Sequence, residues 1–294
     1  MNFSGTTTNH FKEVKLNKIR FSLIILLLFL ILAACSSTDT RTVSDERKSD
    51  GHYQLGLAAL NQGDYIKARH EIMLAIEAAP DLPQYYNTLG IVFMVEHDDK
   101  KAEENFEKAL KIDKKFTDAH NNLGALYLRQ ENFEKALEEF KTVLADTMYP
   151  RPHYVETNIG IVYRKQKRYD LAKQHFEAAI KMRGTFYDPY KQLGLMYDEQ
   201  DMHELAAENY KKAIEYFPYE LETLYKGALK MYLLKNEELG QKYLRNCLEV
   251  QAMNVKEVSM PFLAECVGLA KKFGVTTDIE RRRPEKKQQI ESVE

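Results

Sequence analysis

The sequence lacks the charge imbalance that is typical of proteins that bind nucleic acids. Among its 294 residues, 42 Lys and Arg stand against 44 Asp and Glu, which gives a formal net charge of −2. The motifs of several enzyme classes are also missing: there is no His-Glu-x-x-His, no glycine-rich phosphate loop and no Gly-x-Ser-x-Gly. We therefore expect no nucleic-acid partner, no small-molecule substrate, no cofactor and no catalytic residue.

Clustered metal ligands are almost absent as well. His97, Asp98 and Asp99 are neighbours in a turn between two expected helices. Because three consecutive side chains do not converge on one point, a solvated turn that caps a helix is the better interpretation. The carboxylates of Glu103 and Glu104 lie on a helix surface, where salt bridges are their usual role. No metal site is expected.

Long apolar runs are rare. The run at residues 21–34 follows a positively charged segment and is 14 residues long, which is shorter than the roughly 20 residues that cross a bilayer as a helix. This pattern is typical of an export signal over residues 1–34. The run ends in four residues that resemble the lipobox of bacterial lipoproteins: Leu32, Ala33, Ala34 and Cys35.

The lipobox resemblance implies that Cys35 carries lipid, becomes the first residue of the mature chain and anchors it to a membrane. An uncleaved signal anchor and a plain secretory signal with an incidental cysteine are the alternatives. Ser36 at the next position implies, again by resemblance to lipoproteins, sorting to the outer membrane. Residues 35–48 are polar, so we expect a flexible tether that lets the rest of the chain face the periplasm.

Cysteine is scarce, since only Cys247 and Cys266 remain besides Cys35. In an oxidising periplasm the two thiols could form a disulfide. The alternative is a pair of buried free thiols, because cysteine often packs as a small hydrophobe.

The sequence does contain a regular rhythm of small residues. Five glycines recur at intervals of 34, 34, 36 and 34 residues: Gly56, Gly90, Gly124, Gly160 and Gly194. An alanine follows each glycine after twelve residues: Ala68, Ala102, Ala136, Ala172 and Ala206. Ile or an aromatic residue comes four positions later still. Small residues at this spacing indicate pairs of closely packed helices, with the glycine facing the alanine and the larger residue filling the space beside them.

This frame resembles the tetratricopeptide repeat (TPR), and we predict an all-α superhelix. Six repeats are expected at residues 49–82, 83–116, 117–152, 153–186, 187–220 and 221–254. A capping helix is expected at 255–274 and a disordered charged tail at 275–294. Position 4 of the repeats departs from the usual Trp or Tyr, with His52, His120 and Glu156 among its residues.

Stacked repeats of this kind present a concave groove lined by their first helices. Nine residues at groove positions are predominantly apolar: Tyr53, Leu57, Leu60, Ile91, Met94, Val95, Leu128, Tyr154 and Ile161. We expect them to bind a hydrophobic strand or helix of a partner protein, although some of them could instead pack against neighbouring helices. Position 9 carries no Asn, which disfavours a clamp for a peptide's terminal carboxylate.

The interval of 36 residues contains Ala145-Asp146 and Tyr149-Pro150. With the lipobox and six repeats, this segment resembles the pilotins of type IV pili (PilF, PilW or Tgl type). The resemblance implies a non-catalytic outer-membrane lipoprotein that helps secretin subunits to localise and multimerise. A scaffold for cell-wall enzymes or another envelope machine is the alternative, and an envelope enzyme is a distant one.

Overall fold

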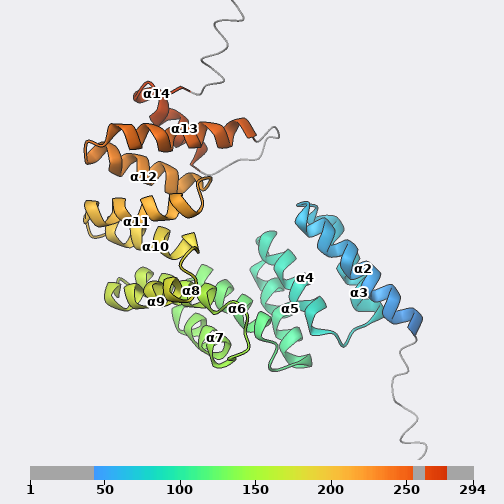
Figure 1. Cartoon of the computed structure of the whole chain (residues 1–294). Coiled ribbons are helices and arrows are strands. Elements are labelled where there is room, and N and C mark those ends of the chain that lie inside the picture. The colour runs from blue at the N-terminus through green and yellow to red at the C-terminus, as the bar shows by residue number, and fades with distance from the viewer. Residues whose placement is uncertain (1–42, 254–261, 277–294) are drawn as a thin grey trace, which may run out of the picture. The chain divides into compact units, whose positions relative to one another are not determined.

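The computed structural model describes residues 43–253 and 262–276. Within these residues the chain forms thirteen helices and no strand, so the prediction of an all-α fold is confirmed. The predicted signal, the lipobox with Cys35 and the tail from residue 277 lie outside the described residues. No helix within them is long and apolar enough to cross a membrane. The chain divides into two compact units, residues 1–85 and 86–294, and each is described by itself (Figure 1).

The first unit contains α2 (Val43–Asn61), α3 (Tyr65–Ala78) and the start of α4 (Pro83–Val95). Its small core joins Ala75, Ala79 and Tyr85, and the Tyr53 ring packs at 4.6 Å from the Tyr85 ring. Apolar side chains of α2 and α3 thus pack around Tyr85, at the start of α4.

The prediction of a tether as far as residue 48 was wrong for residues 43–48, which belong to α2. Ser49 is buried, and its hydroxyl donates to the Glu46 carbonyl (2.9 Å) and accepts from the Tyr85 hydroxyl (3.3 Å). Asp45 and Glu46 lie in the first turn, where their negative charges stabilise the positive end of the helix dipole. These contacts extend the helix into a segment whose polar composition alone indicates a flexible chain.

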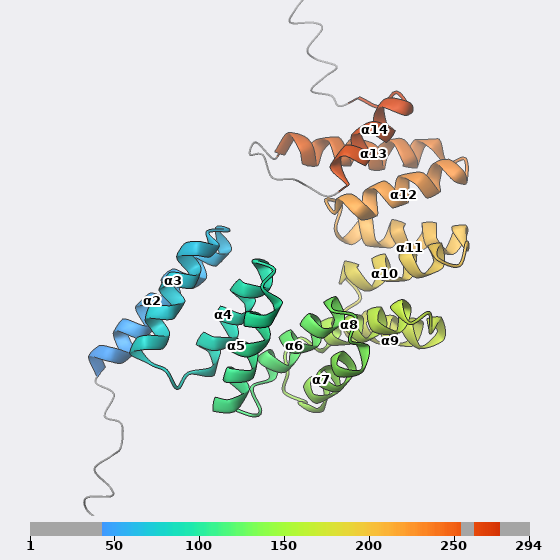
Figure 2. The same ribbon diagram turned by 180° about the vertical axis from the view of Figure 1, so that it is seen from behind.

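The second unit continues as helical hairpins in chain order, and both views show them stacked (Figure 2). After α4, its helices have the following bounds: α5 (Asp99–Ile112), α6 (Thr117–Arg129), α7 (Phe133–Ala145), α8 (Pro152–Lys165), α9 (Tyr169–Met182), α10 (Tyr187–Asp198), α11 (His203–Tyr216), α12 (Leu221–Leu233), α13 (Glu237–Met253) and α14 (Leu263–Lys272). Each helix from α5 onward packs against the next one, and α10 also contacts α8.

The repeated glycines are explained by the residue sixteen positions later. A methyl group placed on Gly124 would lie 2.5 Å from the Phe140 ring, and one placed on Gly160 would lie 2.5 Å from the Phe176 ring. The same holds for Gly90, Gly194 and Gly56 against Phe106, Tyr210 and Ile72. The large residue therefore fills the space beside the glycine, as the spacing predicts, and it lies nearer to the missing side chain than the alanine does. Only a residue without a side chain admits the ring at this distance.

Each hairpin turn has the same backbone arrangement. One residue per turn adopts φ between 57° and 76°: Gly63, His97, Glu131, Lys167, Asp201 and Lys235. The next amide then bonds back to the preceding helix, as from Asn132 N to Tyr127 O (2.8 Å), which satisfies a free carbonyl. The Asp98 and Asn132 side chains cap the following helices, so the turn around His97 to Asp99 is the capping turn that its sequence predicts.

The last three helices share one core around Leu224, Leu244 and Cys247. Here the structure joins Cys247 of α13 to Cys266 of α14, with their Cα atoms 6.0 Å apart. α14 lies within the range predicted for the capping helix, of which residues 255–261 lie outside the described residues. Gly274 ends it with φ of 65°, and Val275 bonds back to the Ala270 carbonyl (2.9 Å). Because Val275 is buried, the prediction that the disordered tail starts at 275 was wrong for this residue.

Candidate protein-binding site

The predicted groove residues of the first unit differ in their surroundings. Tyr53 packs against the core at Tyr85, so part of its ring serves the fold. Leu57 and Leu60 are only partly buried on α2. Their exposed apolar surface is available to a partner.

In the second unit, the structure places four predicted groove residues on α4 and α6. Ile91, Met94 and Leu128 are partly exposed, and Val95 is 37% exposed. The Arg129 guanidinium donates to the Met94 carbonyl (2.8 Å) and pairs with Asp99. Arg129 therefore holds the end of α6 against the end of α4, next to the apolar side chains.

The remaining two predicted groove residues, Ile161 and Tyr154, also pack against other parts of the fold. Ile161 of α8 packs against the cluster of Ala172, Phe176, Leu193 and Met196. Tyr154 is 43% exposed, and its ring contacts the Phe186 ring at 4.6 Å, where α9 leads into α10. Part of the Tyr154 ring therefore packs at the α9–α10 junction, and the rest is exposed.

Amide side chains accompany the apolar residues on α4 and α6, a feature that the sequence reasoning missed. The Asn122 side chain donates to Asn87 Oδ1 (2.8 Å) across the two helices. The buried Oδ1 atom of neighbouring Asn121 has no hydrogen-bond partner among the described residues. Leaving a buried oxygen without a hydrogen bond costs free energy. Asn121 Oδ1 is therefore suited to accept a hydrogen bond from a partner or from water.

Charged residues at the ends of the first helices are paired between repeats. Lys165 bonds to Glu131 (3.2 Å), Arg164 pairs with Glu199, and Lys230 pairs with Asp198. The Tyr210 hydroxyl donates to Asp198 (3.1 Å), and burial raises the pKa of Tyr210. These pairs connect neighbouring hairpins at the ends of their helices.

In the first, third and fourth repeats, position 4 pairs with the residue nineteen positions later, which the sequence reasoning also missed. His52 Nδ1 lies 2.8 Å from Glu71, and His120 Nδ1 lies 2.6 Å from Glu139. In the fourth repeat the order is reversed, with Glu156 at position 4 and His175 2.6 Å away. The sequence does show these pairs, because a His and a Glu stand nineteen residues apart in each of the three repeats. The bond to Glu139 raises the pKa of His120 above its ordinary value.

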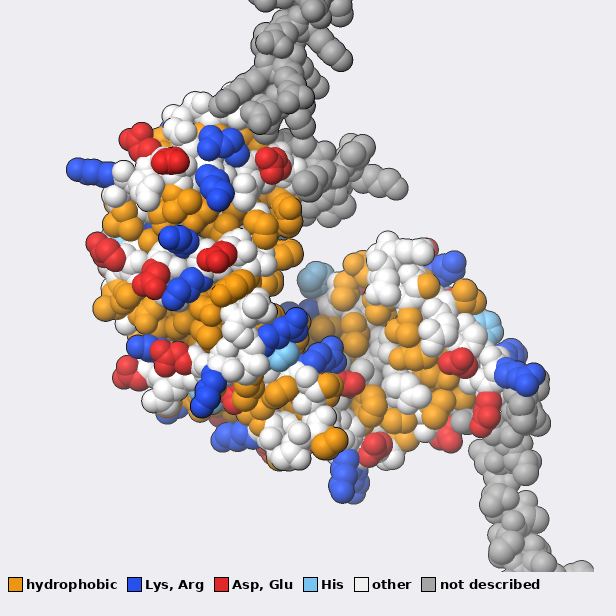
Figure 3. All heavy atoms as spheres, in the orientation of Figure 1, with side chains coloured by type: hydrophobic (Ala, Val, Ile, Leu, Met, Phe, Trp, Pro, Cys, Tyr) orange, Lys and Arg blue, Asp and Glu red, His pale blue; other side chains and the backbone are white. Residues whose placement is uncertain are grey.

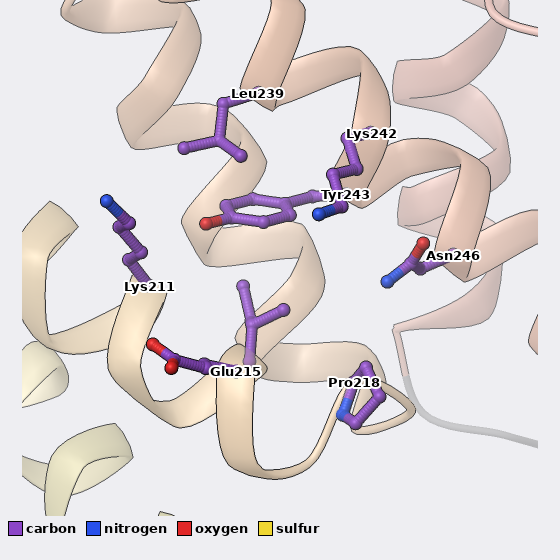
Figure 4. A pocket seen from close by; sticks show the side chains of 8 residues that line it. Lys211, Glu215, Pro218, Leu239, Lys242, Tyr243 and Asn246 are labelled. Atoms are coloured by element: carbon purple, nitrogen blue, oxygen red, sulfur yellow. The ribbon is translucent and has the colours of Figure 1, made fainter.

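A surface hollow of about 370 Å³ lies between α11 and α13 (Figure 4). Lys211, Glu215, Lys242 and Asn246 surround the Tyr243 ring. Burial and the charge of Glu215 raise the pKa of Tyr243 to about 12, so its hydroxyl stays protonated at neutral pH. Among the described residues, no group of three or more His, Cys, Asp or Glu side chains is placed to hold a metal ion.

Comparison with known families agrees with the repeated hairpins. The tetratricopeptide repeat family matches residues 116–185, 49–82 and 187–219. The chain contains tetratricopeptide repeats. In such a TPR protein the glycine and aromatic positions serve the fold, so binding depends on the side chains that the hairpins leave exposed.

One characterised relative of this TPR protein is the type IV pilus assembly protein PilF of Pseudomonas aeruginosa. It is 28% identical over 168 residues, which make up 56% of this chain and 67% of that protein. The chain is therefore homologous to a type IV pilus biogenesis protein at moderate identity.

Solved structures share the TPR fold. PilF of Pseudomonas aeruginosa has a TM-score of 0.60 at 22% identity, covering 71% of this chain and 98% of that chain. PilW, a type IV pilus biogenesis factor, has a TM-score of 0.61 at 23% identity, covering 71% and 95%. A chain of the APC/C hetero-tetramer Cut9–Hcn1 reaches 0.62 at 15% identity, covering 82% and 45%. Shape alone therefore does not distinguish a pilus protein from other TPR proteins.

Proposed function

We propose that this TPR protein is a pilotin: an outer-membrane lipoprotein, anchored through Cys35 and facing the periplasm, that helps the secretin of type IV pili to localise and multimerise. The observation that carries the proposal is the 28% identity to the pilus assembly protein PilF over 168 residues. The protein acts without catalysis in this proposal, since its contribution is to bind and position another protein.

The long interval between the third and fourth repeats supports the proposal, because the residues that resemble the pilotin family determine its geometry. Asp146 accepts hydrogen bonds from the Thr117 hydroxyl (2.7 Å) and the Met148 amide (3.0 Å). Tyr149 is buried beside Arg151, which donates to Asp118 (3.3 Å). The two added residues are thus accommodated in a loop held by specific side chains.

The candidate contacts for the secretin, in this proposal, are partly exposed apolar residues within each unit taken by itself. They are Leu57 and Leu60 in the first unit, and Ile91, Met94, Val95 and Leu128 in the second. Their side chains can bury the apolar face of a strand or helix. Asn121 Oδ1 on α6 provides an unpaired acceptor for the same segment. An apolar surface with few polar groups is the arrangement expected for such a ligand.

Leu57→Asp and Ile91→Asp test this assignment. Each is expected to abolish heat-stable secretin multimers while leaving the circular dichroism spectrum and membrane attachment unchanged, because a charge then faces the apolar ligand. Ile66→Asp, at a residue of α3 that is 73% exposed and lies outside the predicted groove, is the matched control. Normal multimers in both groove variants would refute the groove assignment, and normal multimers after deletion of the gene would refute the pilotin proposal itself.

A further inference from the structure

The last helix of the described chain is short and places only small side chains in the core. α14 contains 10 residues, a length at which an isolated helix is marginal in water. Its buried residues are Cys266 and Ala270. The free energy gained on burial grows with the apolar area removed from water, so these two side chains contribute less than the Phe residues that fill the earlier hairpins. α14 therefore depends on further contacts to stay in place.

The other contacts of α14 are made with α12 and α13, beside which it lies in both ribbon views (Figure 1, Figure 2). Phe273, just after α14, stacks on Tyr232 of α12 with ring centroids 3.5 Å apart. Leu263 and Leu269 pack against the shared core but are only partly buried. Within the described ranges, no ion pair joins α14 to another helix. The noncovalent attachment of α14 is therefore apolar and small.

One covalent bond supplements these contacts. The disulfide joins Cys247 of α13 to Cys266 of α14 across a sequence separation of 19 residues. It limits how far α14 can move from α13 when the noncovalent contacts break. Both cysteines are fully buried, so a reductant reaches the bond only when α14 moves away. We call Cys247, Cys266 and α14 together the C-terminal latch.

The C-terminal latch covers the apolar end of the sixth repeat. Cys266 Sγ lies 3.8 Å from the Leu221 carbonyl oxygen, in the first turn of α12. Leu224 and Leu244 are fully buried in the same core. Figure 3 shows acidic and basic side chains over α13, so the apolar residues of this helix face inward. Removal of α14 therefore exposes part of an apolar core to water.

We propose that the C-terminal latch is a redox-controlled device. In the oxidised chain the disulfide holds α14 on the sixth repeat, and reduction of the bond between Cys247 and Cys266 releases α14 while the earlier repeats stay folded. Local release is expected because each repeat of a stacked array contacts mainly its neighbours, so the end unit can open by itself. The exposed core then becomes accessible to other proteins.

The redox step is a two-electron thiol–disulfide exchange. One thiolate of a dithiol attacks a sulfur of the bond, and its second thiolate then closes a disulfide within the dithiol. Cys247 and Cys266 end as thiols that have taken up the two protons of the dithiol. Reoxidation reverses the exchange on a disulfide-bonded exchange protein, a class that fits the oxidising periplasm where the proposed function places the chain.

Hydrogen exchange of the mature chain, with and without dithiothreitol, tests the C-terminal latch. Cys35→Ser leaves Cys247 and Cys266 as the only cysteines. In the reduced chain, the amides of α14 are expected to exchange about a hundredfold faster than in the oxidised chain. Iodoacetamide should label both thiols of the reduced chain without denaturant. The amides of α9 should exchange equally in both states, because α9 belongs to the fourth repeat.

The double variant Cys247→Ala/Cys266→Ala is the matched control. Its α14 amides should exchange as in the reduced parent chain and should not respond to dithiothreitol. Equal exchange of α14 in the oxidised and reduced parent chains would overturn the proposal. Two free thiols in the air-oxidised chain would do the same, as would loss of protection in α9, which would mean that reduction unfolds the whole chain. Secretin is absent from this experiment, so its result is independent of the pilotin proposal.

Discussion

The third and fourth repeats pack in the same way but carry their polar pair in opposite order. In both, a glycine of the first helix admits a phenylalanine of the second, at Gly124 and Gly160. Beside this contact, His120 pairs with Glu139 in the third repeat, whereas Glu156 pairs with His175 in the fourth, both at 2.6 Å. The comparison teaches that the interior is fixed by shape, while the flanking pair requires only complementary chemistry.

Gly124→Ala is expected to have the largest effect on stability. The new methyl group would lie 2.5 Å from the Phe140 ring, and overpacking of this kind costs about 1–3 kcal/mol. This cost outweighs the helix preference of alanine over glycine, which is about 1 kcal/mol. Urea denaturation should show a loss of about 1–2 kcal/mol in the free energy of unfolding.

Gly268→Ala is the control for this substitution. Gly268 also lies inside a helix, α14, but no atom lies within 4 Å of its missing Cβ. Alanine should therefore stabilise the chain there by roughly 0.5–1 kcal/mol. If Gly124→Ala is instead as stable as the parent chain, shape does not fix the interior in the way the comparison indicates.

The hairpins were predictable because their glycines occupy positions where any side chain collides with a ring. That constraint leaves a mark in the sequence at a fixed spacing, and the ring itself recurs sixteen residues later. The pairs that His120 forms with Glu139 and Glu156 forms with His175 are harder to predict from the sequence. A reading of position 4 alone treats these residues as departures from the repeat, and only the residue nineteen positions later shows their purpose.

Contacts between distant segments were not predictable from local composition. The start of α2 depends on Ser49, which meets Tyr85 36 residues later. The surroundings of Tyr154 depend on how successive junctions stack, so its repeat position assigned it to the groove although its ring packs against Phe186. In both cases the sequence shows the residues but not which surface they share.

Exchanging the polar pair of the third repeat sharpens the comparison and should have an intermediate effect. His120→Glu alone places two carboxylates together and is expected to cost about 1 kcal/mol. Adding Glu139→His should restore most of this loss, because it reproduces the order of the fourth repeat. There His175 stacks on Tyr163 with ring centroids 5.3 Å apart, and Tyr127 occupies the corresponding position of the third repeat.

Full recovery is not expected in the exchanged pair, since His120 Nε2 also bonds to the Lys114 carbonyl (3.1 Å). Free energies of unfolding for both single variants and the double variant give the coupling between the two positions. A double variant no more stable than His120→Glu would show that the order of the pair matters, against the inference from the two repeats.

The pH dependence of the third repeat should give the smallest effect. The hydrogen bond to Glu139 raises the pKa of His120 above its ordinary value of 6.5 in the folded chain. The resulting stabilisation is fully present below the ordinary pKa and is lost as pH rises through the folded pKa. Between about pH 6 and about pH 8, the parent chain should therefore lose more stability than His120→Gln does, by less than about 1 kcal/mol because the pair is partly exposed. Thermal unfolding of both chains measures the difference, and NMR titration should place the pKa of His120 above 6.5; parallel curves would mean that the pair acts through packing and not through charge.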